Sequence, residues 1–156
     1  MKLRLFLAAA LLTGMAHSAF AAGQADQITI ADAYVRQAPP NAKATGAFMT
    51  LKNAGDKDVA VVKASSTAAK ITELHNHIND NGVMRMRQVK DIVVPAKGET
   101  QLKPGSYHVM LIDMKTPLKA DDHVVITLGF ADGSSKEVHA MVKNPMGDMQ
   151  HGHMKH

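Results

Sequence analysis

The stretch that decides the fold is a strand, a turn and a second strand: Lys70-Ile-Thr-Glu-Leu-His-Asn-His-Ile78, Asn79-Asp-Asn-Gly82 and Val83-Met-Arg-Met-Arg-Gln-Val89. Consecutive asparagine, aspartate and glycine residues are typical of a tight reversal of the chain. Residues two apart in a strand share a face. The pattern therefore predicts a hairpin with His75 and His77 on one face of the first strand, and with Met84 and Met86 on one face of the second.

The register of this hairpin has two solutions. A four-residue loop, 79–82, places His75 opposite Met86. In that register His77 faces Met84. A two-residue turn at the end of this loop places His77 opposite Met86 instead. Cross-strand partners have Cβ atoms ~5 Å apart, so either register lets an imidazole and a thioether share one metal ion. The sequence leaves both registers open.

The remainder of the chain also indicates short strands. Alternating or β-branched segments between turns begin at Gln27 and recur at 46–52, 58–65, 91–95, 107–112, 123–130 and 136–142. No segment has an apolar stripe with the 3.6-residue period of a helix. Many short strands separated by turns predict an all-β domain, a sandwich or a barrel.

The first 22 residues have the pattern of a secretory signal peptide. Lys2 and Arg4 precede an apolar run, 5–15, that is too short to span a bilayer. Ala19-Phe-Ala21 is typical of a signal-peptidase site. We therefore expect cleavage, a single β-domain over 23–143 and no membrane span afterwards; an uncleaved anchor is the weaker interpretation.

Composition excludes several classes of function. The chain has no cysteine, so it has neither thiol nor disulfide chemistry. Without Lys2 and Arg4 its formal charge falls from +4 to +2, and no basic run or aromatic platform indicates nucleic acid. Methionine is frequent, with 11 in all. A thioether remains a usable soft ligand where thiolates oxidise.

A third pair of candidate ligands lies in an apolar strand, as His108-Val-Met110. Each pair also has a simpler interpretation, because strand histidines are often surface residues and methionines often fill a core. Three strands could nevertheless aim all three pairs at one point. Imidazole nitrogen with thioether sulfur favours monovalent copper.

The spacing His75-x10-Met86-x21-His108-x-Met110 resembles the motif of the PCu(A)C family of periplasmic copper chaperones. The surrounding residues are similar too: Thr72-Glu-Leu-His75, Asn81-Gly-Val-Met-Arg-Met86, Leu102-Lys-Pro-Gly-Ser-Tyr-His-Val-Met110 and Leu111-Ile-Asp-Met-Lys-Thr-Pro-Leu-Lys119. The similarity covers residues 27–143. One departure is His77, where many members carry methionine or another residue.

The resemblance implies a cupredoxin-like Greek-key β-barrel or sandwich that binds one Cu(I) through His75, Met86, His108 and Met110. It also implies a non-enzymatic periplasmic protein that delivers copper to cytochrome c oxidase, for its CuA centre. The partner would be the copper-bearing subunit of that oxidase or another copper chaperone. His77 and Met84 are accessory candidates.

The last segment, 144–156, has no strand pattern and few core-forming residues, and is predicted to be a flexible tail. Some members of the family have a similar extension that takes part in copper binding. Histidine donors suit Cu(II) and the thioethers suit Cu(I). An incidental polar tail is the alternative. The candidate ligands are Met146, Met149, His151, His153, Met154 and His156.

Two other functions compete with delivery. The same site could sequester copper for tolerance, without a delivery partner. A copper-dependent redox protein is less favoured, because a blue-copper centre needs a cysteine thiolate and the chain has none.

Overall fold

The computed structural model describes residues 23–144. The predicted signal peptide lies outside the described residues, as does the predicted tail except for Asn144. The described chain begins with a short helix, α1 (Gln24–Gln27), and continues as strands: β1 (Ile28–Arg36), β2 (Ala44–Asn53), β3 (Val59–Ser66), β4 (Ala69–Asp80), β5 (Val83–Gln88), β6 (Ile92–Val94), β7 (Glu99–Leu102), β8 (His108–Met114), β9 (His123–Phe130) and β10 (Ser135–Lys143). The all-β prediction is confirmed.

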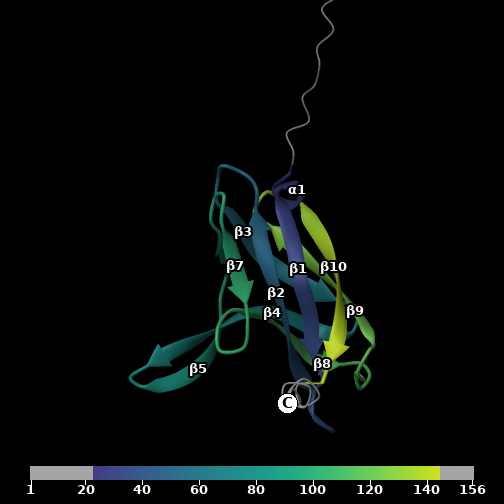
Figure 1. Ribbon diagram of the computed structural model, residues 1–156. Coiled ribbons are helices and arrows are strands. Elements are labelled where there is room, and N and C mark those ends of the chain that lie inside the picture. The colour runs from purple at the N-terminus through teal and green to yellow at the C-terminus, as the bar shows by residue number, and fades with distance from the viewer. Residues whose placement is uncertain (1–22, 145–156) are drawn as a thin grey trace, which may run out of the picture.

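The strands form one sheet in the order β5-β4-β8-β2-β1-β10-β9-β3-β6, with β7 also paired to β2 (Figure 1). β2 pairs with β8 over 44–47 and with β7 over 49–52, so β8 and β7 lie one after the other along β2. β1 and β10 run parallel. β3 and β4 lie side by side although they are distant in this order. The sheet therefore curls back on itself and encloses a core.

The core follows the two-residue period of the strands. In β9 the buried side chains include Val124, Ile126 and Leu128, each 2% exposed or less. In β10 Val138, Ala140 and Val142 alternate with exposed residues. Burying a Val, Leu or Ile side chain contributes about 1.5–3 kcal/mol. This alternation keeps each strand in register, because a shift by one residue would expose its apolar face.

Two elements were not predicted from the sequence, α1 and β7. In α1 the backbone N–H groups of Gln24 and Ala25 donate to the side chains of Asp132 and Ser134, at 2.7 and 3.0 Å. β7 buries a single apolar side chain, Leu102. Both elements depend on tertiary contacts rather than on a local pattern. Within residues 23–144, no helix is long and apolar enough to cross a membrane.

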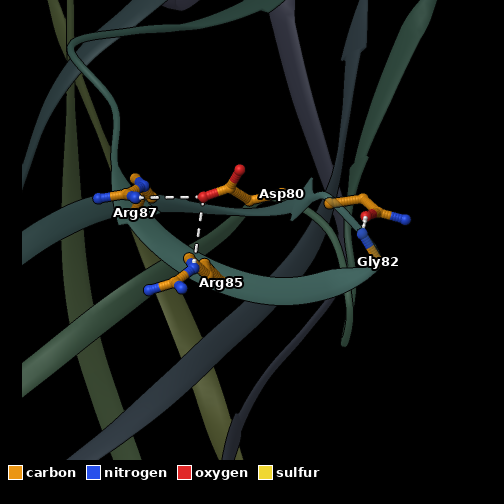
Figure 2. Close-up of polar contacts among 5 residues, drawn as sticks. Asp80, Gly82, Arg85 and Arg87 are labelled. Carbon is orange, nitrogen blue, oxygen red and sulfur yellow. Dashed lines mark hydrogen bonds and ion pairs between the residues drawn. The ribbon is translucent and has the colours of Figure 1, made fainter.

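The hairpin of β4 and β5 projects from the body of the molecule (Figure 1). Asp80 pairs with Val83, so the turn has two residues, Asn81 and Gly82. Their φ angles of 53° and 86° are those that a type I′ turn requires. The Gly82 N–H donates to Oδ1 of Asn79 at 2.8 Å (Figure 2). Of the two registers that the sequence left open, the structure adopts the one with the two-residue turn.

Charged side chains lie on the face of the hairpin opposite to His77 and Met86. The Asp80 carboxylate lies 3.4 Å from Nε of Arg85 and 3.8 Å from a terminal nitrogen of Arg87 (Figure 2). These groups are about half exposed, so each pair contributes little to stability. The two faces therefore differ in chemistry: one carries the ion pairs, and the other carries imidazole and thioether groups.

Candidate metal centre

Strand register brings the candidate ligands of β4, β5 and β8 onto one face. His77 pairs with Met86, and His75 pairs with His108. Because directly paired residues share a face, and residues two apart along a strand also share it, Met110 lies on this face too. Met86 and Met110 are the diagonal neighbours of His75 on either side. His75 is thus the centre of the group.

The imidazoles of His75 and His77 both lie close to the imidazole of His108. The ring centroid of His108 lies 5.8 Å from that of His75 and 5.3 Å from that of His77. Three buried ring nitrogens have no hydrogen-bond partner: Nδ1 of His75, Nδ1 of His77 and Nε2 of His108. A buried polar atom without a partner costs about 1–3 kcal/mol. Unpaired nitrogens grouped in this way suit metal ligation.

The other nitrogens of His75 and His108 are held by neighbouring groups. Nε2 of His75 lies 2.7 Å from Oε2 of Glu73, and an ionised carboxylate can only accept, so in the neutral imidazole this nitrogen donates and Nδ1 has a free lone pair. Nδ1 of His108 lies 2.9 Å from the Ser106 carbonyl, which leaves Nε2 free. Such outer contacts fix the tautomer and orientation of ligating histidines.

The thioethers border a pocket of about 400 Å³ that opens beside the imidazoles. His77, Met86, His108 and Met110 all line it. Met86 is 46% exposed and lines the pocket, so it lies at the pocket mouth. Across the described residues, no three His, Cys, Asp or Glu side chains are placed to hold a metal ion by themselves. Met86 and Met110 are the soft donors that could complete a ligand set with the imidazoles.

Met84 is not brought into the site. It pairs with Asn79 next to the turn and is 55% exposed. The structure therefore groups His75, His77, His108, Met86 and Met110, and places Met84 farther out along the hairpin.

An aromatic side chain that the sequence did not indicate flanks the site. The Phe48 ring lies 6.0 Å from the His108 ring, and the Arg36 guanidinium stands 5.3 Å from the Phe48 centroid. A Cβ at Gly46 would lie 2.9 Å from this ring, so glycine there lets the ring fold back over its own strand. The pairing of β2 with β8 brings Phe48 to the site, and the pairing of β1 with β2 brings Arg36 to Phe48. Glu73 could have been identified from the sequence as a partner of His75, because it lies two residues before His75 and shares its face.

Burial lowers the pKa of His108 below its usual value. The hydrogen bond to the Ser106 carbonyl opposes this shift, whereas the positive charges of His77, His75 and Arg36 add to it. The imidazole is therefore neutral near pH 7. A neutral imidazole is the form that binds a metal ion.

Comparisons with known proteins agree with this fold. The family described as "Putative lipoprotein LpqE-like" matches residues 28–142. "Putative lipoprotein Lxx21020" of Leifsonia xyli subsp. xyli is 37% identical over 125 residues, which are 80% of this chain and 74% of that protein. The uncharacterized protein RP573 of Rickettsia prowazekii is 33% identical over 135 residues, with 80% and 75% covered.

Solved structures of PCuAC domains share the fold. The Cu(I) form of DR1885 from Deinococcus radiodurans is 35% identical, with a TM-score of 0.64 over 79% of this chain and 83% of that one. The copper-bound PCuAC domain of PmoF2 is 18% identical, with a TM-score of 0.65 over 76% and 94%. The predicted cupredoxin-like class is confirmed. The chain belongs to the LpqE-like family, which is the PCuAC family.

Proposed function

We propose that this protein is a copper carrier whose core binds one Cu(I) through His75, Met86, His108 and Met110. The observation that carries the proposal is the pair of unpartnered buried nitrogens, Nδ1 of His75 and Nε2 of His108, on the face that also presents both methionines. The Cu(I) form of DR1885, which is 35% identical to this chain, supports copper as the metal.

The chemistry of these ligands favours Cu(I) over other common metals. Two imidazoles and two thioethers are neutral, and thioether sulfur is a soft donor. Zinc prefers thiolate, imidazole and carboxylate. We therefore expect Zn²⁺ to compete poorly for the core site. A core that bound Zn²⁺ as tightly as Cu(I) would contradict this ligand set.

Exposure of one ligand favours a carrier over an enzyme. Met86 is 46% exposed at the mouth of the pocket, so an incoming donor can reach the metal from that side. Neutral ligands add no compensating negative charge, which favours release. A copper-dependent redox centre of the blue type would need a cysteine, and the sequence has none.

The destination we propose is cytochrome c oxidase and its CuA centre, reached in the periplasm after cleavage of the signal peptide. The pattern of residues 1–22 and the lipoprotein description of the family support export. A strain lacking the gene tests the destination. Lost oxidase activity restored by copper supports delivery. Copper sensitivity with normal oxidase activity would support sequestration instead.

We also propose that the tail, 144–156, binds Cu(II) and supplies copper to the core. Arg36 lines the pocket and pairs with Lys143 at the end of β10, so the tail begins beside the site. Imidazole-rich segments favour Cu(II), whereas the core favours Cu(I). Transfer between them needs one electron from an external reductant, because the chain has no thiol to provide it.

Anaerobic titration tests the core and the tail together. Cu(I) is titrated against a competing chelator into the protein with and without residues 144–156, and Cu(II) is titrated in parallel. We expect deletion to remove a Cu(II) site, to retain one Cu(I) equivalent and to leave the melting temperature of the apo protein nearly unchanged. Loss of the Cu(I) equivalent, or undiminished Cu(II) binding, would contradict the assignment.

A further inference from the structure

We propose that His77 is a transfer ligand: copper leaves the core by moving from His75 to His77 while Met86, His108 and Met110 stay bound to it. This inference rests on the proposed function. It concerns the route of release rather than the resting site. In the step, the bond from copper to His75 breaks as a bond to His77 forms, the bonds to Met86, His108 and Met110 are kept, and the oxidation state of copper does not change.

The position of His77 is as suitable for copper as that of His75. His77 lies directly opposite Met86, whereas His75 is its diagonal neighbour. The His77 ring is 5.3 Å from the His108 ring, and the His75 ring is 5.8 Å from it. Nδ1 of His77 is buried and without a hydrogen-bond partner. His77, Met86, His108 and Met110 therefore form a second ligand set that shares three members with the first.

The two histidines differ in their access to the outside. His77 lines the 400 Å³ pocket with Met86, His108 and Met110, and His75 is not among the residues that line it. The His75 side chain is 13% exposed and its Nε2 is held by Glu73. His75 is thus the interior imidazole and His77 the imidazole on the pocket side.

This arrangement lowers the free-energy barrier to the release of copper. If copper left His75 without a replacement, it would lose a strong donor before a partner's ligand arrived. A bond to His77 replaces that donor and moves the metal toward the pocket, where an incoming ligand can enter. The effect should appear in the rate of transfer more than in the equilibrium affinity.

The first test measures transfer rate against affinity. The full chain is loaded with one equivalent of Cu(I) under anaerobic conditions, and transfer to bathocuproine disulfonate is followed by stopped-flow absorbance. We expect His77→Gln to change the Cu(I) affinity by less than about threefold, under 1 kcal/mol, and to slow transfer by at least about tenfold. His139→Gln, an exposed histidine of β10, is the matched control. Equal rates for His77→Gln and the native protein would overturn the proposal.

The second test asks whether His77 can hold copper without His75. Single His75→Gln and double His75→Gln/His77→Gln variants receive one equivalent of Cu(I), and the Met86 methyl resonance reports binding at this face. We expect the single variant to retain a weakened shift of Met86 and the double variant to lose it. The same response in both variants would overturn the proposal.

Two controls separate this inference from the function on which it rests. No Met86 response in the native protein would mean that the core does not bind Cu(I), and the proposed function would fail. A native response with unaltered transfer in His77→Gln would remove the transfer role alone. Far-UV circular dichroism checks the fold of each variant, and His77→Asn serves as a second substitution with the same expected slowing.

Discussion

His75 and His108 lie directly opposite each other on β4 and β8, with their ring centroids 5.8 Å apart. Each ring is fixed through one nitrogen, by Glu73 and by the Ser106 carbonyl respectively, and each keeps the other nitrogen free. Met86 and Met110 are the diagonal neighbours of His75. A metal ion bound between these two rings would have one thioether on each side, Met86 on β5 and Met110 on β8.

Replacement of Met86 by isoleucine tests whether its sulfur is a ligand. Isoleucine has similar bulk but no sulfur, and the exposed position requires little repacking. We expect Cu(I) affinity, measured by chelator competition, to fall at least about tenfold, roughly 1.4 kcal/mol, with little change in melting temperature. Met84→Ile is the control on the same face of β5 and should leave the affinity intact. Equal effects of the two substitutions would remove Met86 from the site.

Glu73 should act through His75 rather than on the metal ion. Glu73→Ala removes the acceptor that fixes the His75 tautomer, and loss of such an outer partner weakens metal binding by about 10–100-fold. Glu73→Gln keeps an acceptor oxygen and should restore most of the affinity. Nitrogen-15 shifts of the His75 ring in the apo protein report the tautomer. An unchanged ring spectrum in Glu73→Ala would show that the carboxylate does not orient His75.

Acid should destabilise the apo protein through His108. Its pKa in the folded state is lowered from the usual value of 6.5 by burial, so the unfolded chain binds the proton first as the pH falls. The contribution of neutral His108 to the free energy of unfolding is therefore fully present above the unfolded pKa of 6.5. It is lost as the pH falls from 6.5 toward the folded pKa. Urea denaturation at several pH values checks this.

His108→Gln is the control for that measurement and should flatten the pH dependence in this range. The pKa values of Asp113 and Asp132 are also lowered, but they affect stability only in more acidic solution, below the usual value of 3.8. An apo protein equally stable throughout the range in which histidine titrates would contradict the assignment to His108.

Gly46 should be needed for the position of Phe48. An added Cβ would lie 2.9 Å from the Phe48 ring, so the ring must move in Gly46→Ala. Overpacking of this kind costs about 1–3 kcal/mol. Because Phe48 flanks His108, the Cu(I) affinity should fall together with the free energy of unfolding. An unchanged free energy of unfolding would show that the ring adapts freely.

The fold class and the grouping of the ligands could be predicted from the sequence because both follow from period-two patterns. Alternation in 123–130 and 136–142 gave β9 and β10, and parity placed His75 and His77 on one face. Spacing along the chain could not choose between the two hairpin registers, since Asn79 to Gly82 permits either turn. The φ angles of Asn81 and Gly82 settle the choice, and they place His77, not His75, opposite Met86.

Other features needed tertiary information. β7 has no alternating apolar pattern, and it forms because β2 offers an unpaired edge beyond β8. The position of Phe48 beside His108 depends on the pairing of β2 with β8, two strands that are distant in sequence. Whether His77 lies opposite Met84 or Met86 depends on a two-residue shift of the hairpin register, which composition does not determine.

The most direct test of the central claim is methyl NMR of the methionines. The full chain, labelled with carbon-13 at the methionine methyl groups, receives one equivalent of Cu(I) under anaerobic conditions. We predict that the Met86 and Met110 resonances shift, while those of Met49, Met84, Met114 and Met141 stay in place. A response confined to Met146, Met149 and Met154, with Met86 and Met110 unmoved, would contradict a copper site in the core.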